Sequence, residues 1–310
     1  MRIKPGRPDL APHAGLFDVP AADGGLAVTF LGVSTLLLDD GEHAVLTDAF
    51  FSRPSLLRVG LGRIAPDGAR IGAALGRLGL DGPGSRLRAV VPVHTHFDHA
   101  LDSAEVARRT GAFVLGSASA AQLARGARLP EERIQVATPG VPVVHGSFTL
   151  ELVESAHCPP DRYPGRITAP VVPPARARAY RCGEAWSVLV RHSGGRTALV
   201  QGSAGFVPGA LDGRAAEVAY LGVGQLGLQD EGYTRSYWRE TVAAVGARDV
   251  VLIHWDDFFR PLDRPLRALP YAGDDLDVTL RVLGELARAD GVGLHLPAVW
   301  RREDPWAVRG

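Results

Sequence analysis

The segment VPVHTHFDHA, residues 91–100, holds three histidines and one aspartate within six consecutive positions. It overlaps LRAVVPVH (87–94), a continuous apolar run typical of a strand that is buried on both faces. The end of a strand projects the residues that follow it into one small volume. The sequence therefore predicts that four metal-ligand side chains gather at the end of a buried strand: His94, His96, Asp98 and His99.

Neutral imidazoles and carboxylates are the ligands that zinc, iron and manganese use in proteins. His94 and His96 are two positions apart, so both can face the same way from an extended segment. Asp98 and His99 follow and can face a second, neighbouring point. This loop can therefore begin two adjacent metal sites, and two metals about 3.5–4 Å apart polarise an ester or phosphate oxygen and activate water.

The rest of the chain indicates an α/β protein with two similar, sheet-containing halves. Strands are expected within 26–50 and at 87–94, followed by a helix over 101–111 with Ser103 as its N-cap and Gly111 as its terminator. From about residue 143 the pattern repeats in kind and closes with a helix over 274–291. No composition break or solenoid-like period appears. We expect a Pro/Gly-rich N-terminal lead, residues 1–25, and one domain, residues 26–310.

The composition excludes several classes of partner. Basic and acidic residues balance at 34 each, so no basic excess attracts nucleic acid or an anionic membrane. No stretch reaches the roughly 18 uninterrupted apolar residues that a membrane span needs. The first twenty residues lack the apolar core of a signal peptide. We expect a cytoplasmic protein with a small-molecule substrate and no nucleic-acid partner; the sequence leaves its oligomeric state open.

The HTHFDH segment resembles the H-x-H-x-D-H signature of the metallo-β-lactamase superfamily, and most of the chain can be laid along that pattern. The resemblance implies an αββα sandwich built from two similar halves, in agreement with the α/β pattern above. It also implies three further site residues, each at the end of an expected strand: Asp48, His157 and His254.

By this resemblance the chain holds one or two metal ions, zinc being expected and manganese or iron the alternatives. Asp48 would support the site without coordinating a metal. Asp98 would also orient the attacking water or accept its proton. The first metal would be held by His94, His96 and His157. The second would be held by Asp98, His99 and His254.

The chain departs from the family pattern at one position. The family carries a bridging aspartate in a strand-then-turn segment, but in TALVQGSAGF (197–206) Ser203 stands there, and no acidic residue lies between His192 and Asp212. Ser203 is then either a turn residue or a contact for substrate or water. The protein binds one metal, or two without a bridging carboxylate, or recruits a carboxylate from elsewhere. The candidates for recruitment are Asp256, Asp257, Glu154 and Asp230.

Two segments are candidates for the substrate pocket. The Pro-rich loop 158–174 adjoins His157 and is long for a connection, and long loops are often functional. The segment WDDFF, 255–259, follows His254, so its aromatic residues either rim the pocket or pack in the core. The expected substrate contacts are Arg162, Tyr163, Arg166 and Trp255.

The leading hypothesis is a metal-dependent hydrolase that cleaves an ester, lactone or phosphodiester bond. The short HW dipeptide in LIHWDDF is similar to the branch with ascorbate-6-phosphate lactonase and the N-acyl-phosphatidylethanolamine phospholipase D-like enzymes. Ser203 motivates one alternative, a degenerate metal-binding protein without catalysis. The other alternative is a di-iron redox protein, although the carboxylate-rich coordination of such relatives is absent here.

Overall fold

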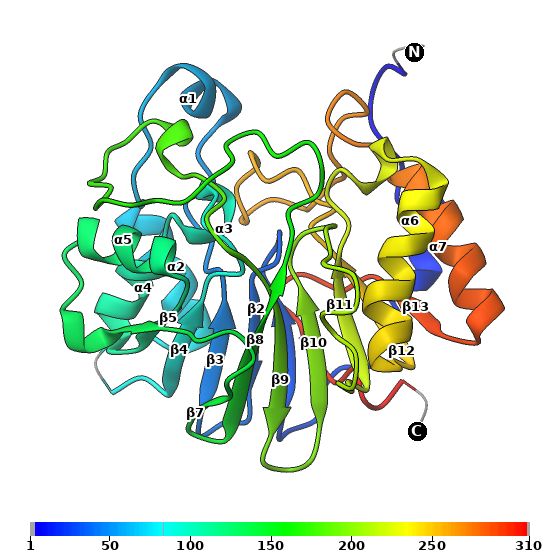
Figure 1. Cartoon of the computed structure of the whole chain (residues 1–310), viewed down its shortest axis with the longest axis horizontal. Coiled ribbons are helices and arrows are strands. Elements are labelled where there is room, and N and C mark those ends of the chain that lie inside the picture. The colour runs from blue at the N-terminus through cyan, green and yellow to red at the C-terminus, as the bar shows by residue number, and fades with distance from the viewer. Residues whose placement is uncertain (1–3, 83, 309–310) are drawn as a thin grey trace.

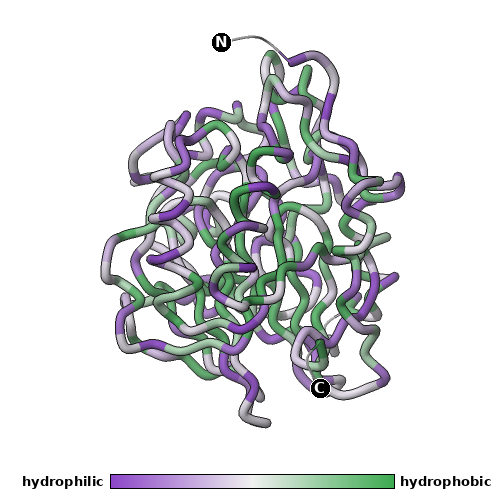
Figure 2. The backbone as a smooth tube through the Cα atoms, turned by 90° about the vertical axis from the view of Figure 1, so that its right-hand side faces the viewer, coloured by the Kyte–Doolittle hydropathy of each residue, from purple (hydrophilic) through white to green (hydrophobic). Residues whose placement is uncertain are grey.

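The computed structural model describes residues 4–82 and 84–308. Within these residues, fourteen strands form two stacked sheets of seven, with helices on both outer faces (Figure 1). This is the αββα sandwich that the sequence predicted. Figure 2 shows hydrophobic segments running through the middle of the molecule and hydrophilic positions along its outer loops.

The first sheet has the strand order β14-β1-β2-β3-β4-β5-β6. β14, β1, β2 and β3 pair antiparallel, whereas β3, β4, β5 and β6 run parallel. The parallel strands require crossover connections, which the helices supply. The strands are β1 Ala27–Phe30, β2 Leu36–Asp39, β3 Ala44–Thr47, β4 Leu87–Val91, β5 Phe113–Gly116, β6 Ile134–Val136 and β14 Arg302–Glu303.

The second sheet repeats this plan in the order β13-β12-β11-β10-β9-β8-β7. β7 to β10 pair antiparallel, and β10 to β13 run parallel. The two halves are therefore similar in topology, as the sequence pattern indicated. The strands are β7 Val143–His145, β8 Phe148–Ser155, β9 Ala185–His192, β10 Thr197–Gln201, β11 Val218–Gly222, β12 Asp249–Ile253 and β13 Gly293–His295.

Helices α2, α4 and α5 lie outside the first sheet, and α6 and α7 lie outside the second (Figure 1). A π-helical segment, η5 (Arg239–Ala243), directly continues α6. Short 3-10 helices are η1 Ala11–Leu16, η2 Glu131–Arg133, η3 Ala177–Ala179 and η4 Leu226–Leu228. The α-helices are α1 Leu56–Leu61, α2 Gly68–Leu78, α3 Phe97–Ala100, α4 Ser103–Thr110, α5 Ala118–Gly126, α6 Glu231–Trp238 and α7 Leu276–Asp290.

The alternation of side chains along the strands builds two layers of core. In β2, Leu36 and Leu38 belong to the cluster that fills the space between the sheets. Leu37, between them, belongs to the cluster under α2 and α4. Successive side chains of a strand point to opposite faces, so a fully apolar strand can serve both layers.

One helix boundary differs from the sequence prediction. Ser103 is not the N-cap of α4 but its first helical residue, and Asp102 occupies the cap position. The Ser103 hydroxyl instead donates to the backbone carbonyl of Asp48, at 2.5 Å. The predicted end is confirmed, because Gly111 closes the helix in the left-handed conformation with φ 74°.

The expected N-terminal lead lies against the domain. Val19 is part of the core, and Ala21 forms an isolated β-bridge with Glu303. The division at residue 25 stays a prediction. Over the described residues, no helix combines the length and the apolar character that crossing a bilayer requires.

Candidate metal centre

The six predicted ligands lie together beyond the ends of strands from both sheets. They form two groups of three, and within each group the ligand atoms lie within 4.8 Å of one another. Their role as ligands stays a prediction, but the sequence grouped them as the structure does. The groups are His94, His96 and His157; Asp98, His99 and His254.

The backbone places these residues by ending strands abruptly. His94 follows β4, and His96 is the N-cap residue of α3, whose first turn carries Asp98. Two strand-end residues adopt positive φ although neither is glycine: Asp48 at 59° and His254 at 61°. Such conformations cost about 1–3 kcal/mol each and persist where the surrounding structure enforces them, often at functional sites.

Pairs of ring nitrogens face each other across the centre. His94 Nε2 lies 3.1 Å from His96 Nδ1, and His254 Nε2 lies 3.2 Å from His99 Nε2. Two nitrogens bound tetrahedrally to one zinc ion, each at about 2.0–2.1 Å, lie about 3.3 Å apart. The spacing of both pairs therefore fits two nitrogens that share a metal ion.

The nitrogens on the far side of two rings have hydrogen-bond acceptors. His99 Nδ1 lies 2.8 Å from Asp48 Oδ2, and His157 Nδ1 lies 2.6 Å from the carbonyl oxygen of Cys158. Each acceptor favours a proton on the outer nitrogen, which leaves the lone pair of the inner nitrogen for a metal. Asp48 therefore stands behind His99, where the resemblance had placed it as a supporting residue.

A third outer partner, Asp161, was missed in the sequence. Its Oδ1 lies 3.2 Å from His96 Nε2, while His96 Nδ1 faces His94. The two residues also form a group with Cys182 within 4.8 Å. The sequence did contain a signal for this residue, because Asp161 is the only acidic residue between Pro159 and Pro174, in the Pro-rich loop that adjoins His157.

Burial keeps three of the imidazoles neutral: those of His94, His99 and His157. It lowers the pKa values of His94 and His99 well below their ordinary range, and the neighbouring imidazoles lower them further. Burial also lowers the pKa of His157 to about 4. Neutral imidazole is the form that binds metals, so at neutral pH these three rings need release no proton to do so.

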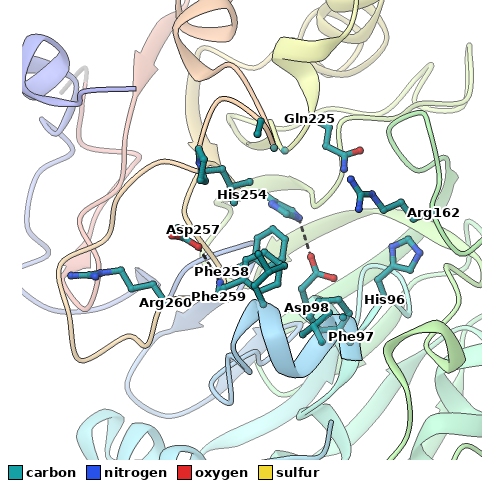
Figure 3. A pocket seen from close by; sticks show the side chains of 18 of the residues that line it. His96, Phe97, Asp98, Arg162, Gln225, His254, Asp257, Phe258, Phe259 and Arg260 are labelled. Carbon is teal, nitrogen blue, oxygen red and sulfur yellow. Dashed lines mark hydrogen bonds and ion pairs between the residues drawn. The ribbon is translucent and has the colours of Figure 1, made fainter. Parts of the chain in front are cut away.

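Asp98 belongs to the second group and faces its two histidines. Its Oδ2 is 3.6 Å from both His99 Nε2 and His254 Nε2. Figure 3 shows its carboxylate pointing into the pocket, with His254 and His96 on either side. Its backbone lies on the first turn of α3, so the carboxylate is held by a regular element and still reaches the pocket.

Ser203 follows β10 and lines the same pocket. Its Oγ accepts the backbone N–H of Cys158 at 3.0 Å, so it holds the chain directly after His157. Its own carbonyl accepts hydrogen bonds from Gln201 Nε2 at 3.0 Å and Tyr237 Oη at 3.3 Å. Ser203 is therefore a structural link beside the centre, and it belongs to neither ligand group.

None of the four candidate replacement carboxylates belongs to either ligand group of the described residues. Asp256 pairs with Arg53 at 2.7 Å, and Asp257 pairs with two arginines. Asp230 caps α6 through the backbone N–H of Tyr233, and Glu154 is exposed on β8. Since none of them lies in a ligand group, recruitment of one of them finds no support in the geometry.

A pocket of about 750 Å³ opens over the centre. Of the predicted substrate contacts, Arg162 and Tyr163 line it. Arg166 does not: its exposed side chain pairs with Glu184 at 3.2 Å. That expectation is corrected, because the loop turns Arg166 toward solvent.

Trp255 is the second correction. It is 3% exposed, and its ring packs against Phe17 and Phe30 in the core at centroid distances of 6.3 Å. It directly follows His254, where the positive φ turns the chain, so Trp255 enters the core while His254 faces the pocket. From the same WDDFF segment, Phe258 and Phe259 line the pocket instead.

No known family model and no curated protein matches this sequence. Solved structures do match. Igni18, a metallo hydrolase from Ignicoccus hospitalis, is 15% identical with a TM-score of 0.50, covering 90% of this chain and 96% of its own. The metallo-beta-lactamase fold protein YhfI from Bacillus subtilis is 14% identical with a TM-score of 0.50, covering 90% and 97%. The fold is that of the metallo-β-lactamases.

CmlA, a diiron beta-hydroxylase from Streptomyces venezuelae, has a TM-score of 0.56 at 14% identity. The match covers 91% of this chain but 54% of CmlA, so this chain corresponds to about half of that protein. The fold is thus shared by proteins described as hydrolases and by one described as a diiron beta-hydroxylase. At such identities the likeness concerns the fold, and the chemistry has to be argued from the residues of this chain.

Proposed function

We propose that this protein is a metal-dependent hydrolase that activates water to cleave an ester, lactone or phosphodiester bond. The observation that carries the proposal is the pair of ligand groups with ring nitrogens facing each other at 3.1 and 3.2 Å. Buried imidazoles in this arrangement have little use in a metal-free protein. Within the hydrolases, we propose that the chain is related to the lactonase and phospholipase D-like branch, on the basis of the HW dipeptide at 254–255.

The donor set suits zinc, since five of the six side chains are imidazoles. One ion would be held by His94, His96 and His157, and the other by Asp98, His99 and His254. When bound, the ions supply Lewis acidity, which lowers the pKa of water and polarises the substrate oxygen.

The side chains around the ions have separable roles. Asp98 accepts the proton of the attacking water, because its carboxylate reaches the pocket. Asp48 and Asp161 orient His99 and His96 from behind. Ser203 keeps the chain after His157 in place through the N–H of Cys158.

We expect two ions per chain, bound with unequal affinity. Each group has three ligands, which is the number that catalytic zinc sites draw from the protein. With serine at position 203, no carboxylate is shared by the two groups, so the first bound ion repels the second with less compensating negative charge. Ser203→Asp should therefore tighten the second site.

The test is a stepwise zinc titration of protein purified without added metal, read by elemental analysis and by competition with a chromophoric chelator. Turnover is assayed on para-nitrophenyl esters, an acyl-homoserine lactone and bis(para-nitrophenyl) phosphate. We expect two ions, and hydrolysis of one substrate class by loaded protein only. Asp98→Asn should remove turnover, whereas His192→Gln, a histidine paired with Asp40 outside the centre, should not.

Failure of wild type and Ser203→Asp alike to retain metal after loading would reject the proposal in favour of the degenerate alternative. A second result would also count against hydrolysis. In it, the protein binds two ions but turns over no substrate class, and its Asp98→Asn variant binds metal identically.

The second candidate function is di-iron redox chemistry, and the observation that favours it is the similarity in fold to CmlA. The donor set argues for hydrolysis instead, because only one of the six ligands is a carboxylate. Iron content after aerobic purification, together with visible absorption, separates the two. Two tightly held irons with a charge-transfer band, and no hydrolysis after zinc loading, would favour the redox function.

A further inference from the structure

We propose that the pocket selects a substrate with an apolar segment and an anionic group remote from the bond that is cleaved, and that Arg260 and Arg264 hold this anion. The inference rests on the proposed function for the position of the reacting bond. It adds the class of substrate: an amphiphilic carboxylate, phosphate or sulfate.

The first observation is the charge of the pocket lining. The whole chain is balanced, with 34 basic and 34 acidic residues. The pocket, in contrast, is lined by five arginines and two aspartates. One of the aspartates is Asp98 in the centre. The other, Asp257, is shared by Arg7 at 3.3 Å and Arg267 at 2.9 Å.

The remaining three pocket arginines are Arg162, Arg260 and Arg264. Within residues 4–82 and 84–308, no carboxylate lies within ion-pair distance of them. Arg260 Nε donates to the carbonyl of Pro265 at 2.9 Å, which holds the arm of the side chain and leaves its terminal nitrogens for a ligand. Guanidinium groups bind carboxylates, phosphates and sulfates through paired hydrogen bonds.

The second observation is an apolar wall between Arg260 and the centre. The rings of Phe258 and Phe259 lie 4.5 Å apart, and Phe258 is 5.9 Å from the His254 ring. In Figure 3 the two phenylalanines stand between Asp98 and His254 on one side and Arg260 on the other. Leu56, from α1, also lines the pocket and is 63% exposed.

This order of groups dictates the shape of the ligand. A bond placed at Asp98 and His254 leaves the rest of the molecule over Phe258 and Phe259, where apolar groups gain from leaving water. The far end then meets Arg260. A neutral end would gain nothing from these guanidinium groups, whereas an anion would form charge-assisted hydrogen bonds with them.

The test measures binding, so it does not depend on turnover. Zinc-loaded protein is titrated with dansyl-undecanoic acid and with its methyl ester, which differ only in the terminal charge, and dansyl fluorescence is read. Removing hydrogen bonds to a charged group typically costs about tenfold or more in affinity. We expect the acid to bind at least about tenfold more tightly than the ester, and octyl phosphate and octanoate to displace it better than octanol.

Three variants locate the preference. Arg260→Gln/Arg264→Gln should bring acid and ester to similar affinities. Arg288→Gln, an exposed arginine on α7 outside the pocket, should leave the preference unchanged. Phe258→Ala should weaken acid and ester alike.

Equal affinities of acid and ester for the wild-type protein would overturn the inference. So would a preference that survives the double arginine substitution and vanishes on removal of metal, because the anion would then bind the metal ions. If the protein hydrolyses none of the substrates but prefers the acid to the ester, and this preference needs the two arginines, the proposed function alone is rejected. Normal hydrolysis without the preference would reject this inference alone.

Discussion

At the scale of single residues, the centre depends on which nitrogen of each histidine carries the proton. His99 and His96 each have a carboxylate behind the ring, Asp48 at 2.8 Å and Asp161 at 3.2 Å. A carboxylate in this position fixes the ring orientation and raises the basicity of the inner nitrogen. The two aspartates come from different parts of the chain and face different ring atoms, Nδ1 of His99 and Nε2 of His96.

Asp161→Asn is expected to lower zinc affinity by about 10–100-fold, because the outer nitrogen of His96 loses its charged neighbour. The measurement is competition with a chromophoric chelator at fixed pH. Asp81→Asn, at an exposed aspartate before the start of β4, whereas the ligands follow its end, is the matched control and should bind zinc as the wild type does. An unchanged affinity for Asp161→Asn would show that the carboxylate has no influence on the ligand.

At the scale of elements, the loop after β3 is tied to the start of α4 by a buried carboxylate. Asp102 accepts hydrogen bonds from the backbone N–H groups of Phe51 and Ser52 and from the Ser52 hydroxyl. Burial nevertheless dominates and raises the pKa of Asp102 to about 7. This link connects α4, which follows the ligand loop, to the loop that begins with Asp48.

The raised pKa predicts a pH dependence of stability. Between pH 3.8 and about 7 the folded protein keeps the Asp102 proton that the unfolded chain releases. This contribution to stability is therefore complete at low pH and is lost as pH rises through about 7. A shift of about three pKa units corresponds to about 4 kcal/mol.

Asp102→Asn should flatten the dependence over that window, since asparagine does not titrate. Urea unfolding of metal-stripped protein at a series of pH values measures the effect and avoids contributions from metal release. Asp81→Asn again serves as the control and should keep the wild-type slope. Parallel curves for wild type and Asp102→Asn would contradict the assignment.

At the scale of the whole molecule, a buried ion pair joins the two halves beneath the pocket. Arg53, after β3, lies 2.7 Å from Asp256, after β12, and both side chains are fully buried. Asp256 Oδ1 also accepts the backbone N–H of Val33 at 2.7 Å. The arginine passes over Gly32, where a Cβ atom would lie 1.8 Å from its guanidinium, so only glycine fits there.

Arg53→Met is expected to lower the free energy of unfolding by about 3–5 kcal/mol, because it leaves the Asp256 charge buried without a partner. Arg53→Met/Asp256→Asn should recover much of that loss, since asparagine carries no charge and still accepts from Val33. Urea unfolding measures both variants. Equal losses in the single and double variants would mean that packing rather than charge determines the cost.

Much of the fold could be predicted from the sequence because its signals are local. Apolar strands, turn residues and Gly111 act within a few positions, and they were sufficient for the two similar halves. Ser103 was misassigned because long-range contacts engage both side chains: the Ser103 hydroxyl binds the carbonyl of Asp48, and the Asp102 carboxylate binds Ser52 instead of capping the helix.

The HTHFDH loop is contiguous, and His157 and His254 follow predicted strands, so the sequence and its family resemblance were sufficient to group the six predicted ligands. Only the tertiary structure decided what surrounds it: Asp161 behind His96, Trp255 in the core, and the arginines and phenylalanines of the pocket. The physical reason is that strand ends have a local signature, whereas the contacts of loop side chains depend on how distant segments pack. Loop residues with no periodicity, such as Arg260 and Arg264, acquire their meaning when the sheets bring them to the same pocket.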